Sequence, residues 1–141
     1  MHESPLNMTR SPEGGLLVRM LNSSGGTLLK GKTVRADAGT NDGMILAATS
    51  DEMAIGVVYQ DILAGVYGWI VVAGIAEVLI DTAGALTPGF WVGCSTSTTG
   101  ECSAQAASPG STVQHFREIG HTIQSRAGGA TTRVRCIIHF N

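Results

Sequence analysis

The longest apolar run of the chain, Ile62–Ile80, limits the possible folds most strongly. Glu77 is its only charged residue, so its length approaches that of a membrane-spanning helix. However, Gly65, Gly68 and Gly74 interrupt it, and most of its other residues are aromatic or β-branched, a composition that favours strands over helices. We therefore predict a buried β-strand in this run and no membrane span.

Both faces of the Val66–Ala73 segment are apolar, because large hydrophobic residues stand at odd and even positions alike. Side chains of a strand alternate between the two faces of a sheet. A small barrel or sandwich would bury one face in its own core and leave the face with Tyr67 and Trp69 to be covered. We expect an overlying arm or a neighbouring subunit to cover this second face, which is a first indication of oligomerisation.

The glycine content indicates short strands and many turns. Nineteen of the 141 residues are glycine, and each glycine costs a helix about 1 kcal/mol relative to alanine. With 43% hydrophobic and only 14% charged residues, the chain is too apolar to be disordered and long enough to bury one core. We predict a single all-β domain over residues 16–141, built as a small β-barrel or a β-sandwich.

The first fifteen residues differ from the rest of the chain. They are mostly polar and show no apolar period, so residues 1–15 are predicted to form a flexible N-terminal arm. They also lack the apolar segment of a secretory signal, which indicates synthesis in the cytoplasm. An arm that folds on a partner would contact it through its larger side chains, which are Pro5, Leu6, Met8, Arg10 and Pro12. A frayed tail without function is the alternative.

Two patterns occur twice and indicate two similar halves. The pair Ile55-Gly56 recurs as Ile119-Gly120, and the Gly-x-x-Val pattern that begins at Gly31 recurs at Gly89. Glycine permits the sharp bends that close a small sheet. Each half is therefore predicted to contain the same sequence of turns and strands.

Three arginines and three aromatic residues are candidates for contacts with another protein. Guanidinium groups bind carboxylates at two points, and tryptophan and tyrosine are enriched at the energetic centres of interfaces. The candidates are Arg126, Arg133, Arg135, Tyr67, Trp69 and Trp91. A solvated strand face is the alternative for the arginines, and packing in the core is the alternative for the tryptophans.

The sequence has no arrangement of residues typical of an active site. The segment Gly93-Cys94-Ser95-Thr96-Ser97 lacks the second glycine of a serine nucleophile elbow, and no long helix is predicted that could offer its N-terminus to a phosphate after a glycine pair. His115, His121, His139 and the cysteines are potential zinc ligands, but no Cys-x-x-Cys or His-x-x-x-His spacing occurs. We therefore predict no catalytic residue, no cofactor and no metal site.

The charge distribution and the cysteines give two further expectations. The net charge is −2 and there is no basic run, so binding to nucleic acid is not expected. The three cysteines, Cys94, Cys102 and Cys136, are expected to be free buried thiols. Cys94 and Cys102 flank a predicted hairpin and would face each other, so a disulfide between them stays open as an alternative.

A set of glycines and small apolar residues at strand spacing resembles a known family. It comprises Gly31-Lys32-Thr33-Val34, Gly43 with Ala47-Ala48, Ala54-Ile55-Gly56-Val57-Val58, the run from Gly65 to Val78, Thr87-Pro88-Gly89-Phe90-Trp91-Val92 and Ile119-Gly120. Over residues 16–140 the chain resembles the capsid decoration (cement) proteins of tailed bacteriophages. The resemblance implies a virion protein on the outer capsid surface.

This resemblance also implies partners and a mechanism. The chain would bind the major capsid protein, associate into a homotrimer and stabilise the shell against the pressure of the packaged DNA. It would act by burying surface rather than by catalysis. The alternatives are a tail or fibre-base component of a virion, and a β-barrel that binds a glycan.

Overall fold

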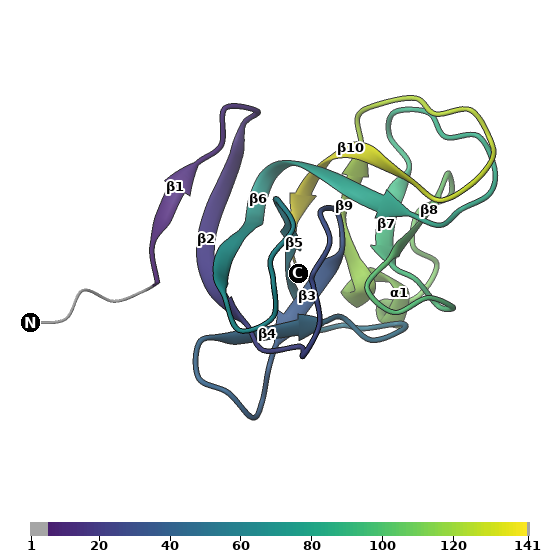
Figure 1. The fold of residues 1–141 in the computed structure, drawn as a ribbon. Helices are drawn as coiled ribbons and strands as arrows, with labels where there is room; N and C mark the ends of the chain where they lie inside the picture. Colours follow the sequence, from purple (N-terminus) through teal and green to yellow (C-terminus); the bar gives the residue numbers. More distant parts are fainter. Residues whose placement is uncertain (1–5, 141) are drawn as a thin grey trace, which may run out of the picture.

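The computed structural model describes residues 6–140, and most of their regular structure is β (Figure 1). Ten strands are present: β1 (Met8–Arg10), β2 (Gly15–Asn22), β3 (Thr33–Ala36), β4 (Gly43–Leu46), β5 (Ala54–Val58), β6 (Tyr67–Ile80), β7 (Trp91–Cys94), β8 (Cys102–Gln105), β9 (Glu118–Thr122) and β10 (Thr132–His139). A short helix, α1 (Thr112–Arg117), precedes β9. Within residues 6–140 no helix has the length and apolar character that a membrane span requires. The predicted all-β fold is confirmed.

Five strands close into a first small barrel. β2 pairs with β6, β6 with β5, β5 with β3 and β3 with β4, all antiparallel. The ring is closed by a short parallel pairing of β4 with β2, in which Leu21 and Asn22 lie opposite Gly43 and Met44. This barrel has its own buried cluster, which consists of Leu28, Val34, Met44, Val58, Ile62 and Ile70.

The second half of the chain closes into a second barrel. β6 pairs with β10, β10 with β9, β9 with β7 and β7 with β8, all antiparallel, and a parallel bridge between Ile80 and Cys102 returns the ring to β6. Its buried residues include Val78, Leu86, Val92, Val134 and Ile138. They form one cluster with Leu17, Val57 and Val71 of the first barrel, so the two barrels share a packed junction.

Strand β6 belongs to both barrels. Its first part pairs with β2 as far as Gly74, and its second part, from Ala73 onward, pairs with β10. Gly74 has a φ of 82°, and a Cβ atom at this position would overlap with the carbonyl oxygen of Gly14. The strand can therefore change partner here because the residue is glycine. Figure 1 shows β6 arching from one barrel to the other.

The sharing of β6 explains why both faces of its first part are apolar. Ile70 lies in the core of the first barrel, whereas its neighbour Val71 lies in the cluster that continues into the second barrel, and both are buried. We expected an arm or another subunit to cover the second face of this strand. In the middle of the strand no such cover is needed, because the second face is buried there by the chain's own packing at Val71. Tyr67 and Trp69, at the beginning of β6, are half-buried.

The two barrels repeat the same pairing pattern. In the first, Val34 of β3 lies opposite Gly56 of β5, and a bulge follows the valine. In the second, Val92 of β7 lies opposite Gly120 of β9, again with a bulge after the valine. The isolated bridges correspond as well, since Leu28 pairs with Ile62 and Leu86 pairs with Arg126. The predicted division into two similar halves is confirmed.

The N-terminal segment departs from the prediction of a flexible arm. Met8–Arg10 pairs with Leu16–Val18 as an antiparallel strand, and Ser11, at the turn, is buried and accepts a hydrogen bond from the Gly15 backbone through its hydroxyl oxygen. A strand at a sheet edge is held by its backbone, so it forms without the apolar period that marks an inner strand. Residues 1–5, including Pro5, lie outside the described residues.

Candidate interaction surfaces

Four neighbouring side chains form an exposed apolar surface on the first barrel, which we call the apolar patch: Leu63, Val66, Tyr67 and Trp69. Leu63 is 65% exposed and Val66 is 46% exposed. Together with Gln60 they line one shallow hollow between the loop that follows β5 and the start of β6. Large apolar side chains gathered in this way are typical of a surface that binds another protein. The predicted candidates Tyr67 and Trp69 thus lie in one surface, and Leu63 and Val66 extend it.

A buried asparagine holds the loop that carries the apolar patch. The Asn22 side-chain amide donates hydrogen bonds to the carbonyl oxygens of Ile62 and Gly26, both at 2.8 Å. The Asn22 backbone N–H donates to the carbonyl oxygen of Val66, and the Gly65 N–H donates to the carbonyl oxygen of Asn22. Asn22 is fully buried, and these bonds, together with those that its side-chain oxygen accepts from Ser24, satisfy its polar groups. The loop is therefore presented in a fixed conformation.

Tyr67 and Trp69 are packed against the sheet on one side and reach the surface on the other. Arg19 of β2 lies opposite Trp69 in the β2–β6 ladder, and its guanidinium group stands 5.6 Å from the centre of the Tyr67 ring. Trp69 also packs against the buried cluster at the junction of the barrels. Both rings therefore combine a structural contact with an exposed face, as an interface anchor requires.

Strand β1 provides a second surface, because it lies at the end of the strand order and pairs only with β2 among residues 6–140. Its outer backbone groups can accept a strand from another chain. Met8 is 61% exposed, and Leu6, Arg10 and Pro12 are also exposed. These four predicted contact residues thus lie on or beside an edge strand that forms part of the fold.

Trp91 is not available as an interface anchor. It is 4% exposed and begins β7, which lies between β8 and β9 and is buried over its whole length. Core packing, the alternative left open by the sequence, is therefore its role in this structure. Trp91 is buried because β7 is an inner strand of the second barrel. The glycine-rich sequence around β7 does not reveal that the strand has a neighbour on each side.

The three candidate arginines do not form one patch. The Arg126 guanidinium donates hydrogen bonds to the carbonyl oxygens of Ile80, Thr82 and Gly84, so it holds the loop that follows β6. Arg133 and Arg135 are exposed on β10. The solvated-face alternative fits these two, while Arg126 is a structural residue.

Replacement of Arg126 by alanine is expected to lower the free energy of unfolding by about 1–2 kcal/mol, because it leaves backbone carbonyl groups without their donor. Arg133→Ala is the matched control, and its expected change is within about 0.5 kcal/mol, as for other exposed positions. Urea unfolding followed by circular dichroism measures both. Equal unfolding midpoints for the two variants would show that the Arg126 contacts contribute nothing.

All three cysteines are buried free thiols. Cys94 and Cys102 lie directly opposite each other in the β7–β8 ladder. The hydrogen bond with Cys94 and burial raise the pKa of Cys102, and burial raises the pKa of Cys136 to about 12. Because the thiolate is the reactive form, the raised pKa values protect Cys102 and Cys136, and burial shields all three thiols from reagents in the folded protein.

The native protein is therefore expected not to react with Ellman's reagent at neutral pH. After unfolding in guanidinium chloride without reductant, all three thiols should react. A value of one thiol per unfolded chain would instead indicate a disulfide between Cys94 and Cys102. The same titration after reduction serves as the control, since it must give the full count.

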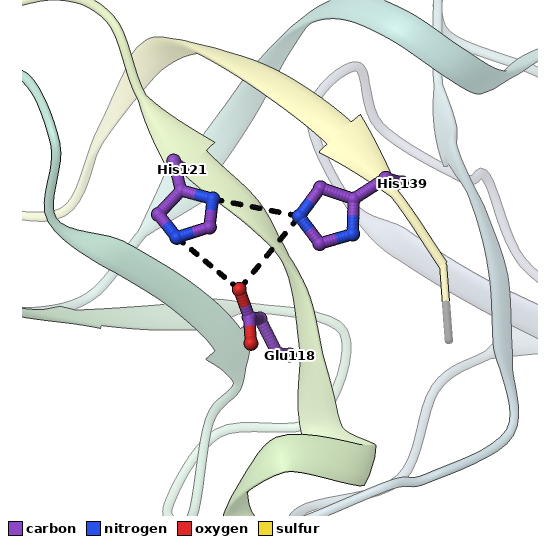
Figure 2. A group of neighbouring side chains, drawn as sticks. All are labelled: Glu118, His121 and His139. Atoms are coloured by element: carbon purple, nitrogen blue, oxygen red, sulfur yellow. Dashed lines mark hydrogen bonds and ion pairs between the residues drawn. The ribbon is translucent and has the colours of Figure 1, made fainter. Parts of the chain in front are cut away.

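Glu118, His121 and His139 come together on the second barrel, as Figure 2 shows. Glu118 begins β9, His121 follows on the same strand, and His139 ends the neighbouring β10. Glu118 is buried, whereas both histidines are exposed. Sequence spacing missed this cluster because it arises from the register of β9 with β10. The Glu-x-x-His pattern at Glu118 was its one local signal.

No protein-family model matches the chain, and no curated protein sequence matches it. A solved structure with a similar fold is the head fiber gp8.5 N base of bacteriophage phi29. The two chains superpose with a TM-score of 0.59 at 12% sequence identity. The match covers 87% of this chain and 94% of the other. At this level of identity the likeness establishes a shared fold.

Proposed function

We propose that the chain is a structural protein of a phage virion that binds the surface of the head. The observation that carries this proposal is the likeness of fold to a head fiber base of phage phi29, which extends over nearly the whole of both chains. The sequence resemblance to capsid decoration proteins over residues 16–140 points independently to the same class of protein.

The apolar patch and the free edge of β1 are the surfaces through which the chain would bind its partners. The patch supplies apolar area that is released from water on contact. The edge supplies backbone donors and acceptors for a strand of another subunit. Contacts of this kind act by burying surface, and specific ones commonly cover about 1,600 Å² in total.

The finer proposal is a homotrimer that binds the major capsid protein. Symmetric association places the same surface several times over a symmetric site, and simultaneous contacts raise the overall affinity well above that of one contact. This arrangement suits a subunit that must hold a shell of repeated proteins together. The trimer and the capsid partner follow from the resemblance to decoration proteins.

Particles assembled with and without the chain test this proposal. Particles that carry it are expected to release their DNA at a higher temperature than particles of a deletion mutant, measured by the fluorescence of a DNA-binding dye. Adding the purified chain back should restore the difference. Equal release temperatures would contradict a stabilising role.

The likeness of fold to the head fiber base of phage phi29 favours one alternative, the base of a head fibre. A fibre base would carry a further protein or segment that projects from the head, whereas a decoration protein would lie flat on the lattice. Electron microscopy of particles with an antibody against the chain distinguishes these arrangements. Labelling confined to the tail would contradict both.

A further inference from the structure

We propose that Glu118, His121 and His139 bind one zinc ion. The three residues offer a carboxylate oxygen and two imidazole nitrogens, and one donor atom from each lies within 4.8 Å of the others. Proteins bind zinc with carboxylate and imidazole ligands, and sites with three protein ligands keep a fourth position for water or another group. The proposal is independent of the function proposed above, because it rests on this cluster alone.

Two of the donor distances in the cluster, those from the carboxylate to each ring, are close to the spacing of a tetrahedral site. Zinc–nitrogen and zinc–oxygen bonds of about 2.0–2.1 Å place neighbouring donor atoms about 3.3–3.4 Å apart. The Glu118 Oε1 atom is 3.3 Å from His121 Nε2 and 3.7 Å from His139 Nε2. His139 Nε2 is 3.4 Å from Nδ1 of His121. Figure 2 shows that His121 contacts Glu118 and His139 through different nitrogens. A zinc ion takes one nitrogen of each ring, so the exposed His121 ring would turn when an ion binds.

The charge of the cluster favours a cation. The Glu118 side chain is only 5% exposed, and its ion pairs within residues 6–140 are all with histidines. A buried carboxylate is costly unless a positive charge lies beside it. A divalent ion bound between the carboxylate and the two rings would supply it.

The site is open on one side and supported on the other. The side chains of His121 and His139 are 47% and 46% exposed, so an ion can enter from solvent and its fourth position can be filled by water. His115 Nδ1 lies 3.2 Å from Glu118 Oε2, the oxygen that does not face the two rings. His115 is therefore a positioning residue, which orients the carboxylate toward the ion.

The donor set also selects among ions. Calcium and magnesium prefer shells made wholly of oxygen, whereas imidazole nitrogen suits zinc and the other late first-row metals. The ion would join β9 to the end of β10 and thereby fasten the last strand of the second barrel. Zinc is thus expected to raise the melting temperature of the protein, and magnesium is not.

Isothermal titration of the full chain, without an affinity tag and with reductant present, tests the proposal. Zinc chloride is expected to bind with one ion per chain, and magnesium chloride to give no binding heat. His121→Ala and His139→Ala should each weaken zinc binding by more than about 100-fold, and His115→Ala by about 10-fold, as for partners outside the ligand set. Arg135→Ala is the control, because Arg135 is exposed and lies on β10 together with His139. This variant should bind zinc like the wild type.

A second measurement does not depend on variants. In the wild type, one equivalent of zinc should shift the imidazole NMR signals of His121 and His139. Absence of zinc binding to the wild type would overturn the proposal. So would undiminished binding in the double variant His121→Ala/His139→Ala, because the ion would then lie elsewhere, for example at the cysteines.

Discussion

Replacement of Gly120 by alanine is expected to lower the free energy of unfolding by about 3 kcal/mol or more. Gly120 lies in β9 directly opposite Ile138 of β10. A Cβ atom there would overlap with the carbonyl oxygen of Ile137 and would lie 2.8 Å from the Cα of Ile138. Both atoms belong to the backbone of β10, so they cannot move aside without opening the β9–β10 ladder. Guanidinium unfolding followed by circular dichroism measures the effect.

Gly84→Ala is the matched control for this prediction. Gly84 has no other atom within 4 Å of the position of a Cβ and has no positive φ, so its substitution should change stability by no more than about 0.5–1 kcal/mol. Gly56 is the counterpart of Gly120 in the first barrel, and a Cβ there would lie 2.6 Å from Cδ1 of Ile70. Equal stability of the Gly120 and Gly84 variants would contradict the close approach that shapes both barrels.

The double substitution Leu63→Arg/Val66→Arg is expected to abolish attachment to capsids while the protein stays folded. Both side chains are exposed, so the charges cost little in the isolated subunit. In a contact with the capsid, the two introduced charges would be buried without partners. This burial costs about 2 kcal/mol or more of binding free energy, which corresponds to a loss of roughly 30-fold or more in affinity. Co-sedimentation of the purified variant with particles that lack the chain measures attachment.

Val113→Arg is the control for the patch variant. Val113 is 58% exposed and lies on α1, which packs against β7 of the second barrel. This variant introduces the same charge outside the apolar patch and should attach like the wild type. Attachment of the patch variant at wild-type strength would mean that another surface binds the capsid. Size-exclusion chromatography with light scattering on both variants shows whether the patch also takes part in the proposed trimer.

Much of the fold follows from short-range patterns in the sequence. The alternation in β10 correctly separates buried Val134, Cys136 and Ile138 from the exposed arginines. The repeated Ile-Gly and Gly-x-x-Val patterns correctly indicate two halves, because each half needs a bulge after its valine and a strand backbone close to its glycine. These features depend on local geometry, which the residues themselves determine.

Other features depend on which strands pair and in which register, and short-range patterns in the sequence do not reveal them. Two barrels share β6, so a strand with two apolar faces needs no outside cover at Val71. The edge strand β1 has no apolar period because its backbone holds it in place. The His121–His139 contact depends on the register of β9 with β10. Arg126 pairs with Leu86 in the second barrel as Ile62 pairs with Leu28 in the first. Arg126 is therefore a structural residue, although the sequence predicted it as a contact residue.

Electron cryomicroscopy of purified particles from a phage that encodes this chain tests the proposed function most directly. The account predicts that the two joined barrels fit density repeated over the outer surface of the head, with the apolar patch turned toward a neighbouring subunit. Particles that contain no copy of the chain, or that hold it only at the tail, would contradict the account.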